Sequence, residues 1–158
     1  MSIRILWEFF AAATGTMAFA LLFHVPKKYY PFCGLIGGCG WVCYEILLNV
    51  CSAPVATFFA NTVVVLLSRF FAVRKQCPVT LFLVSGIFPL VPGAGIYWTA
   101  YYMVTNELDL AGQRGFQTLK IAVAIVLSIL LVFELPQRMF AGKKESGCMR
   151  KKADKWNR

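Results

Sequence analysis

Charge and catalytic side chains are scarce in this sequence. Only 15% of its 158 residues are charged, whereas about 25% is usual for a soluble domain. It has a single histidine, His24, and neither a metal-ligand cluster nor a nucleophile–base pairing accompanies it. We therefore predict no enzymatic activity, no metal and no cofactor, and we interpret His24 as a residue at the membrane interface.

The six cysteines do not follow the pattern of a disulfide-rich domain or of a metal site. Cys39 and Cys43 share a helical face, but two thiols alone make a poor metal site. We interpret the cysteines as small hydrophobic residues that pack between helices.

Apolar residues, in contrast, make up 59% of the chain. They form five segments long enough to cross a bilayer, separated by short polar connections. The pattern predicts an all-α integral membrane protein in which residues 1–142 form one transmembrane domain and residues 143–158 a basic cytoplasmic tail. The five helices are expected at about 5–25, 31–50, 54–73, 79–104 and 118–140, with a polar loop before the last of them.

The net charge of +9 raises the question of nucleic-acid binding, but the basic residues cluster beside the membrane segments. Eight of the sixteen lysines and arginines lie between Arg138 and Arg158, and no aromatic-interleaved basic face is present. An N-out/C-in orientation places thirteen of the sixteen on the cytoplasmic side and three outside. The positive-inside rule therefore favours N-out/C-in, and contact is expected with lipid and not with nucleic acid.

The fourth segment is interrupted at Phe88–Tyr97, which contains Pro89, Pro92, Gly93 and Gly95. A proline costs about 3 kcal/mol and a glycine about 1 kcal/mol in a helix interior. Counting from the start of the segment places Pro89 near the middle of the bilayer. Irregular backbone at that depth occurs only where it is buried in protein or lines a cavity. The segment is therefore predicted to be a broken helix at a transport site, with a re-entrant loop or a simple proline kink as the alternatives.

Several polar residues and glycines in the other segments have two interpretations each. Glu45 is either a functional carboxylate or an interfacial residue, and Asn61 either lines a cavity or joins two helices. Arg69 is expected to extend toward the lipid headgroups. The glycines of the second segment predict close helix packing; they are Gly34, Gly37 and Gly38.

Four stretches together resemble the small membrane subunit of the split threonine/serine exporter family. They are Phe23-His24-Val25-Pro26, Gly34–Gly40, Ser68-Arg69 and Ile87–Tyr97 with its Pro-Leu-Val-Pro-Gly core. The resemblance covers roughly Ala11 to Val132.

The resemblance implies proton-coupled export of threonine and serine, or of small dicarboxylates such as succinate, across the bacterial cytoplasmic membrane. It also implies a larger partner with a similar five-helix unit, so that this chain is one half of an inverted-repeat transporter. A homo-oligomer, and a non-conducting structural or regulatory subunit, remain as alternatives. The expected substrate path comprises the residues of the break, two hydroxyls and a facing amide: Pro89, Pro92, Gly93, Ala94, Gly95, Tyr97, Thr99 and Asn61. Glu45 is the candidate proton carrier.

Overall fold

The computed structural model describes residues 2–134, and this part of the chain is helical without any strand. The predicted all-α class is thereby confirmed. The elements, in chain order, are α1 (Ser2–Leu22), η1 (Lys27–Tyr29), α2 (Tyr30–Leu48), α3 (Ala53–Lys75), α4 (Val79–Ile87), η2 (Phe88–Leu90), α5 (Gly93–Val104) and α6 (Leu108–Glu134).

Four helices of the described part are long and apolar enough to cross a membrane: α1, α2, α3 and α6. The segment Val79–Leu90 and α5 pass the same test as a pair that is bent by 50°. The described chain therefore has four spans, or five if the bent pair counts as one, as expected for a multi-pass membrane protein.

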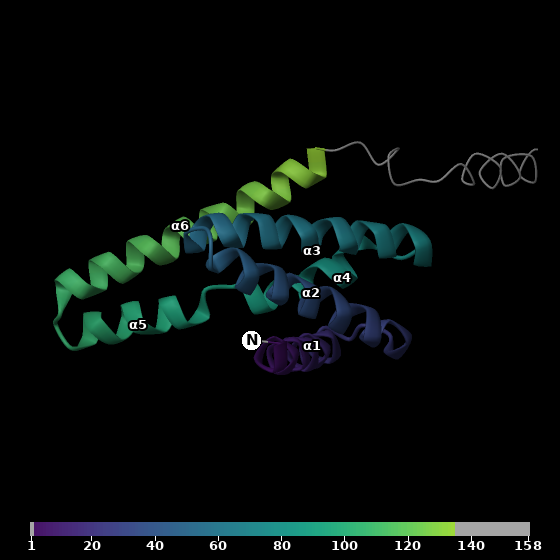
Figure 1. Cartoon of the computed structure of the whole chain (residues 1–158), viewed down its shortest axis with the longest axis horizontal. Helices are drawn as coiled ribbons and strands as arrows, with labels where there is room; N and C mark the ends of the chain where they lie inside the picture. The colour runs from purple at the N-terminus through teal and green to yellow at the C-terminus, as the bar shows by residue number, and fades with distance from the viewer. Residues whose placement is uncertain (1, 135–158) are drawn as a thin grey trace, which may run out of the picture.

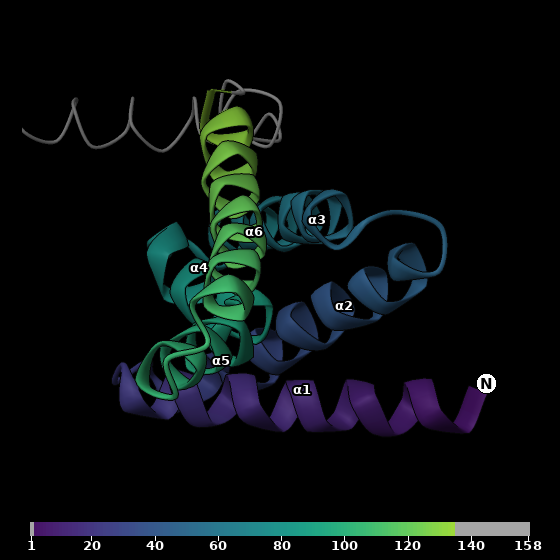
Figure 2. The ribbon, with the colours of Figure 1, turned by 90° about the vertical axis from the view of Figure 1, so that its left-hand side faces the viewer.

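The helices are not all parallel. Figure 1 shows α3 from the side and α1 nearly along its axis, whereas Figure 2, turned by 90°, shows α1 from the side and α3 nearly along its axis. These two helices cannot both run along a membrane normal, although most transmembrane helices tilt only moderately. Figure 1 also shows that α5 and the first half of α6 form a hairpin that extends beyond the other helices.

Helices α3 and α6 run in the same direction. Asn61 in the first half of α3 contacts Ile125 and Ser128, while Arg69 near the end of α3 contacts Val132 near the end of α6. Since α6 begins at the end of the molecule where α3 begins, α4 and α5 together carry the chain from one end to the other.

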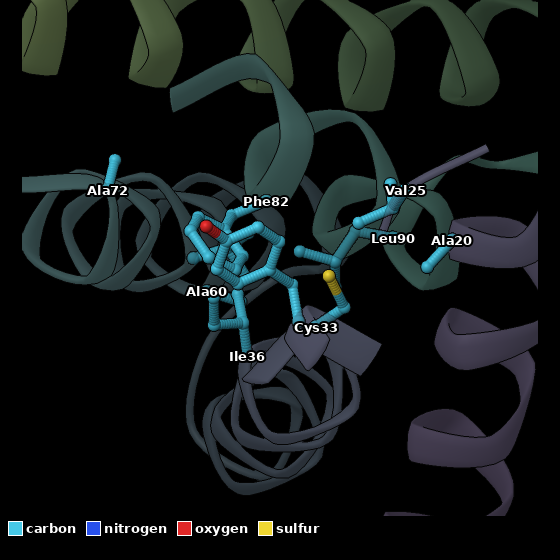
Figure 3. Close-up of a cluster of buried hydrophobic side chains, with 10 residues drawn as sticks. Ala20, Val25, Cys33, Ile36, Ala60, Ala72, Phe82 and Leu90 are labelled. Atoms are coloured by element: carbon cyan, nitrogen blue, oxygen red, sulfur yellow. The ribbon is translucent and has the colours of Figure 1, made fainter. Parts of the chain in front are cut away.

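A core of small and large apolar residues joins the helices around the break in the fourth segment. Figure 3 shows Phe82 of α4 among residues from α1, α2 and α3, with Leu90 of η2 in the same cluster. Phe82 is fully buried, and its ring meets the Tyr29 ring edge-on. Leu90 belongs to this core, so packing of the core holds the break in position.

Glycines permit the close approach of α2 to α1. A Cβ atom added at Gly37 would overlap the Thr16 side chain, and one added at Gly38 would lie 2.6 Å from the Phe9 ring. Gly34 faces Met17 in the same interface, while Gly40 faces Val64 of α3. The structure thus places the three predicted packing glycines against a single neighbour, α1.

Replacing Gly37 with alanine is expected to lower the free energy of unfolding by about 1–3 kcal/mol, because the added methyl group overpacks the α1–α2 contact. The matched control is Gly112→Ala in α6, where a Cβ atom meets nothing within 4 Å. That change is expected to stabilise the protein by up to about 1 kcal/mol through helix propensity. Thermal unfolding in detergent measures both, and equal shifts in the two variants would contradict the packing argument.

The boundaries of the last helix differ from the prediction. Residues 108–117, expected as a polar loop, are the first ten residues of α6, which begins at Leu108. Asp109 in the first turn favours a helix start, since a carboxylate interacts well with the positive end of the helix dipole. The predicted continuation to residue 140 and the basic tail at 143–158 lie outside the described residues.

The expectation that Arg69 extends to the headgroups is wrong. Its residue exposure is only 4%, and its Nη1 donates a hydrogen bond of 2.6 Å to the carbonyl oxygen of Val132. The guanidinium group also lies over the Phe133 ring, 4.9 Å from its centre. Arg69 stays inside because the carboxyl end of α6 offers it acceptors and a negative dipole end.

Candidate functional site

The break between α4 and α5 is shorter than predicted. After the 3₁₀ turn of η2, only Val91 and Pro92 leave helical geometry, with ψ angles of 129° and 57°. Gly93 is already the first residue of α5, so the unwound link does not extend to Tyr97. A helix can begin directly after Pro92, because the amides of the first turn need no partner within the helix.

A cavity of about 430 Å³ lies at this break. Its lining includes the residues from Pro89 to Gly95, and α2, α3 and α6 supply the other walls. The side chains from these helices are Trp41 and Tyr44, Ala53 and Thr57, and Arg114, Gln117, Thr118 and Ile121. Prolines and glycines predicted from the sequence therefore do line a cavity, together with residues of three other helices.

Unpaired main-chain groups of both polarities belong to residues that line the cavity. Within the described backbone, neither the amide of Ala94 nor that of Gly95 donates to a main-chain oxygen, and the carbonyls of Pro89 and Leu90 accept no main-chain amide. The missing amide of Pro92 contributes to this, because it would otherwise be the donor three residues after Pro89. The break thus offers two donors and two acceptors over a few residues.

The electrostatics of the cavity favour an anion. The amino-terminal end of α5 carries the positive end of its helix dipole, and Arg114 stands on the facing wall of the cavity. Among the described residues that line the cavity, none is acidic. A carboxylate is therefore the chemical group that this cavity attracts most strongly, while the free carbonyls suit an ammonium group.

Two predicted hydroxyl ligands lie away from this cavity. Tyr97 is 62% exposed, and its ring packs edge-on against Trp98. Thr99 donates a hydrogen bond of 2.7 Å to the carbonyl oxygen of Gly95 and faces Gly115 of α6. The helical start at Gly93 explains this difference, since positions 97 and 99 then lie a full turn farther along α5 from the break than Gly93 and Gly95.

Asn61 does not line the cavity either. It is fully buried, and its Nδ2 donates to the carbonyl oxygen of Ile125 at 3.1 Å and to the Ser128 hydroxyl at 2.5 Å. It lies one helical turn beyond the lining residue Thr57. Of its two interpretations, the structure favours the one in which Asn61 joins two helices.

Glu45 is half-buried and lies outside the lining, although its neighbour Tyr44 belongs to it. Its carboxylate is near enough to Arg4 of α1 for the two charges to attract each other. A second carboxylate, Glu8, forms an ion pair with Arg4 at 2.7 Å and lines a smaller hollow against Pro89. Both carboxylates therefore lie near the break without lining the cavity described above.

The sequence-based prediction of the site did not include the four lining residues that α6 contributes. Arg114, Gln117, Thr118 and Ile121 follow the spacing of one helical face, and this spacing is the signal that could have identified them. The sequence predicts a polar loop at Arg114 and Gln117, and side chains of a loop have no predictable position relative to the break.

Comparison with known proteins identifies the family. The family model described as "Threonine/Serine exporter, ThrE" matches residues 8–134. The chain belongs to this threonine/serine exporter family. The resemblance noted in the sequence is thereby confirmed, and every residue that lines the cavity falls within the matched range.

A curated relative in Haemophilus influenzae, described as an uncharacterized protein, is 32% identical over 104 residues. The match covers 65% of this chain and 35% of the relative, so the exporter-family chain spans about a third of that protein's length. No solved structure matches the chain.

Proposed function

We propose that the chain is a subunit of a secondary active exporter of small amino acids, with threonine and serine as substrates. The substrate carboxylate binds between the amino-terminal end of α5 and Arg114, and its ammonium group binds the free carbonyls of Pro89 and Leu90. The observation that supports this most directly is the pairing of unpaired amides and carbonyls in one cavity. An amino acid presents both complementary groups, whereas a dicarboxylate such as succinate uses only the donors.

The distribution of basic residues supports an N-out/C-in orientation. Lys28 and Lys75 both lie close to Cys77, so the α1–α2 and α3–α4 connections share one end of the molecule. By the positive-inside rule this end is cytoplasmic. The cavity, lined by the second half of α2 and the first turns of α3, then faces the outside. In this orientation α4 and α5 form one broken crossing and not a re-entrant loop, because α3 and α6 run in the same direction.

A second five-helix unit would complete the transporter. Helix α5 has no buried residue, and its hairpin with α6 extends beyond the other helices (Figure 1). An odd number of spans gives two similar halves opposite orientations, as an inverted-repeat transporter requires. We propose a larger homologous partner in the bacterial cytoplasmic membrane, and protons as the coupling ion with Glu45 as candidate carrier.

The test is counterflow of labelled substrate in proteoliposomes that contain this chain, its partner, or both. Uptake of threonine and serine that requires both chains is the expected result, with succinate much weaker. Full transport by the partner alone would show that this chain is a non-conducting structural or regulatory subunit. Succinate as the preferred substrate would overturn the roles assigned to the carbonyls of Pro89 and Leu90.

A further inference from the structure

Two basic connections that are far apart in the sequence meet at the end of the molecule opposite the cavity. Lys27 and Lys28 belong to η1, and Arg74 and Lys75 end α3. The Lys75 ammonium lies over the Phe32 ring at the start of α2, 4.4 Å from its centre. The two connections therefore form one surface, which we name the basic corner.

Cys77, in the α3–α4 connection, lies close to residues of both basic connections. Burial raises the pKa of its thiol, while a hydrogen bond with Tyr29 and the charges of Lys28 and Lys75 act in the opposite direction. These influences place the Tyr29 side chain and the two ammonium groups beside one half-buried sulfur atom.

The cations of the basic corner have no carboxylate partner within the described residues. Within residues 2–134, an ion pair joins Arg4 and Glu8, near the other end of α2. Glu134 ends α6, directly after Phe133, whose ring contacts Arg69. Within the described residues, Glu134 forms no ion pair with Lys28, Arg74 or Lys75. Four like charges held together by the fold repel one another, and a bound anion relieves that repulsion.

Aromatic rings lie beside the cations of the basic corner. The Arg74 guanidinium lies over the Phe70 ring at 5.2 Å, and the Lys28 ammonium lies over the Tyr29 ring at 4.7 Å. Phe70 is 43% exposed and lies one turn before Arg74, on the part of α3 that continues toward the membrane interior. A ligand with a phosphate and an adjoining apolar chain matches this arrangement, whereas a free phosphate would use only the cations.

We propose that Lys28, Arg74 and Lys75 form a binding site for the phosphate of an anionic phospholipid headgroup. The acyl chains of this lipid lie along the exposed side of α3 next to Phe70. The site is independent of the substrate cavity, so its test does not depend on the proposed transport activity.

Native mass spectrometry of the purified full-length protein tests the proposal. Phosphatidylglycerol and phosphatidylcholine with identical acyl chains are titrated, and the affinity of the first bound lipid is compared. Since each basic residue contributes about fivefold to binding at an anionic surface, Lys28→Ala/Lys75→Ala is expected to weaken phosphatidylglycerol binding about 25-fold. Binding of phosphatidylcholine should stay unchanged, and Lys28→Arg/Lys75→Arg should retain the preference. Both side chains are exposed, so these variants should fold normally.

The matched control is Lys120→Ala. Lys120 also lies over an aromatic ring, Phe116, at 4.4 Å, but it belongs to α6 and lies outside the basic corner. Its replacement should change phosphatidylglycerol affinity less than twofold. A preference that survives Lys28→Ala/Lys75→Ala but disappears in Lys151→Ala/Lys152→Ala would assign lipid binding to the tail and overturn the proposal. Displacement of the lipid by an equal concentration of glycerol 3-phosphate would also overturn it, because the site would then bind any soluble phosphate.

Discussion

Replacing Arg114 with glutamine is expected to raise the KM for threonine about 10- to 100-fold. Arg114 lines the same cavity as the amino-terminal end of α5, where the substrate carboxylate is proposed to bind. A hydrogen bond to a charged group contributes about 1.5–3 kcal/mol, and glutamine keeps the approximate length of the side chain but removes its charge. Initial rates of threonine counterflow over a range of substrate concentrations measure the change.

Two further variants show whether this effect depends on geometry and position. Arg114→Lys retains the charge but loses the planar fork that can bind both carboxylate oxygens, so an intermediate KM is expected. Lys120→Gln removes a cation from the same helix, six residues nearer its middle and outside the cavity lining, and should leave the KM unchanged. If Arg114→Gln and Lys120→Gln had equal effects, Arg114 would act through the general charge of the surface and not as a ligand.

The periodicity of apolar residues was sufficient to predict the helices, but not the start of α6. Residues 108–117 contain Asp109, Gly112, Arg114 and Gly115, a composition typical of a loop. They form a helix because they pack beside α5: a Cβ atom at Gly115 would lie 3.2 Å from Thr99. This contact joins two segments that sequence periodicity treats separately, so the face with Arg114 could not be assigned to the cavity in advance.

The site was predictable where a backbone property decided it. Pro89 and Pro92 remove amides whatever the surroundings, and the break does occur there and does line a cavity. Asn61 and Thr99, in contrast, are polar residues whose partners depend on how the helices are rotated about their axes. Their side chains contact other helices or the preceding turn instead of the cavity. The periodicity of apolar residues in one sequence does not fix that rotation.

The second large effect is expected on stability, from replacement of Arg69 with methionine. Position 136 is a proline, which has no amide N–H. In an α-helix the carbonyl of residue 132 pairs with the amide of residue 136, so the Val132 carbonyl cannot be satisfied in this way. The Nη1 of Arg69 donates to that oxygen at 2.6 Å. Methionine keeps most of the apolar stem but leaves the carbonyl unpaired, which should lower the free energy of unfolding by about 1.5–3 kcal/mol.

A compensating change tests this explanation directly. Pro136→Ala supplies an amide N–H four residues after Val132, so it should recover part of the stability lost in Arg69→Met while having little effect on its own. Unfolding of the single and double variants in detergent gives the coupling between the two positions. If the double variant were as unstable as Arg69→Met, the arginine would act mainly through its contact with the Phe133 ring and its charge at the end of α6. If the coupling is found, the amide that the sequence lacks at position 136 explains why the Val132 carbonyl depends on Arg69.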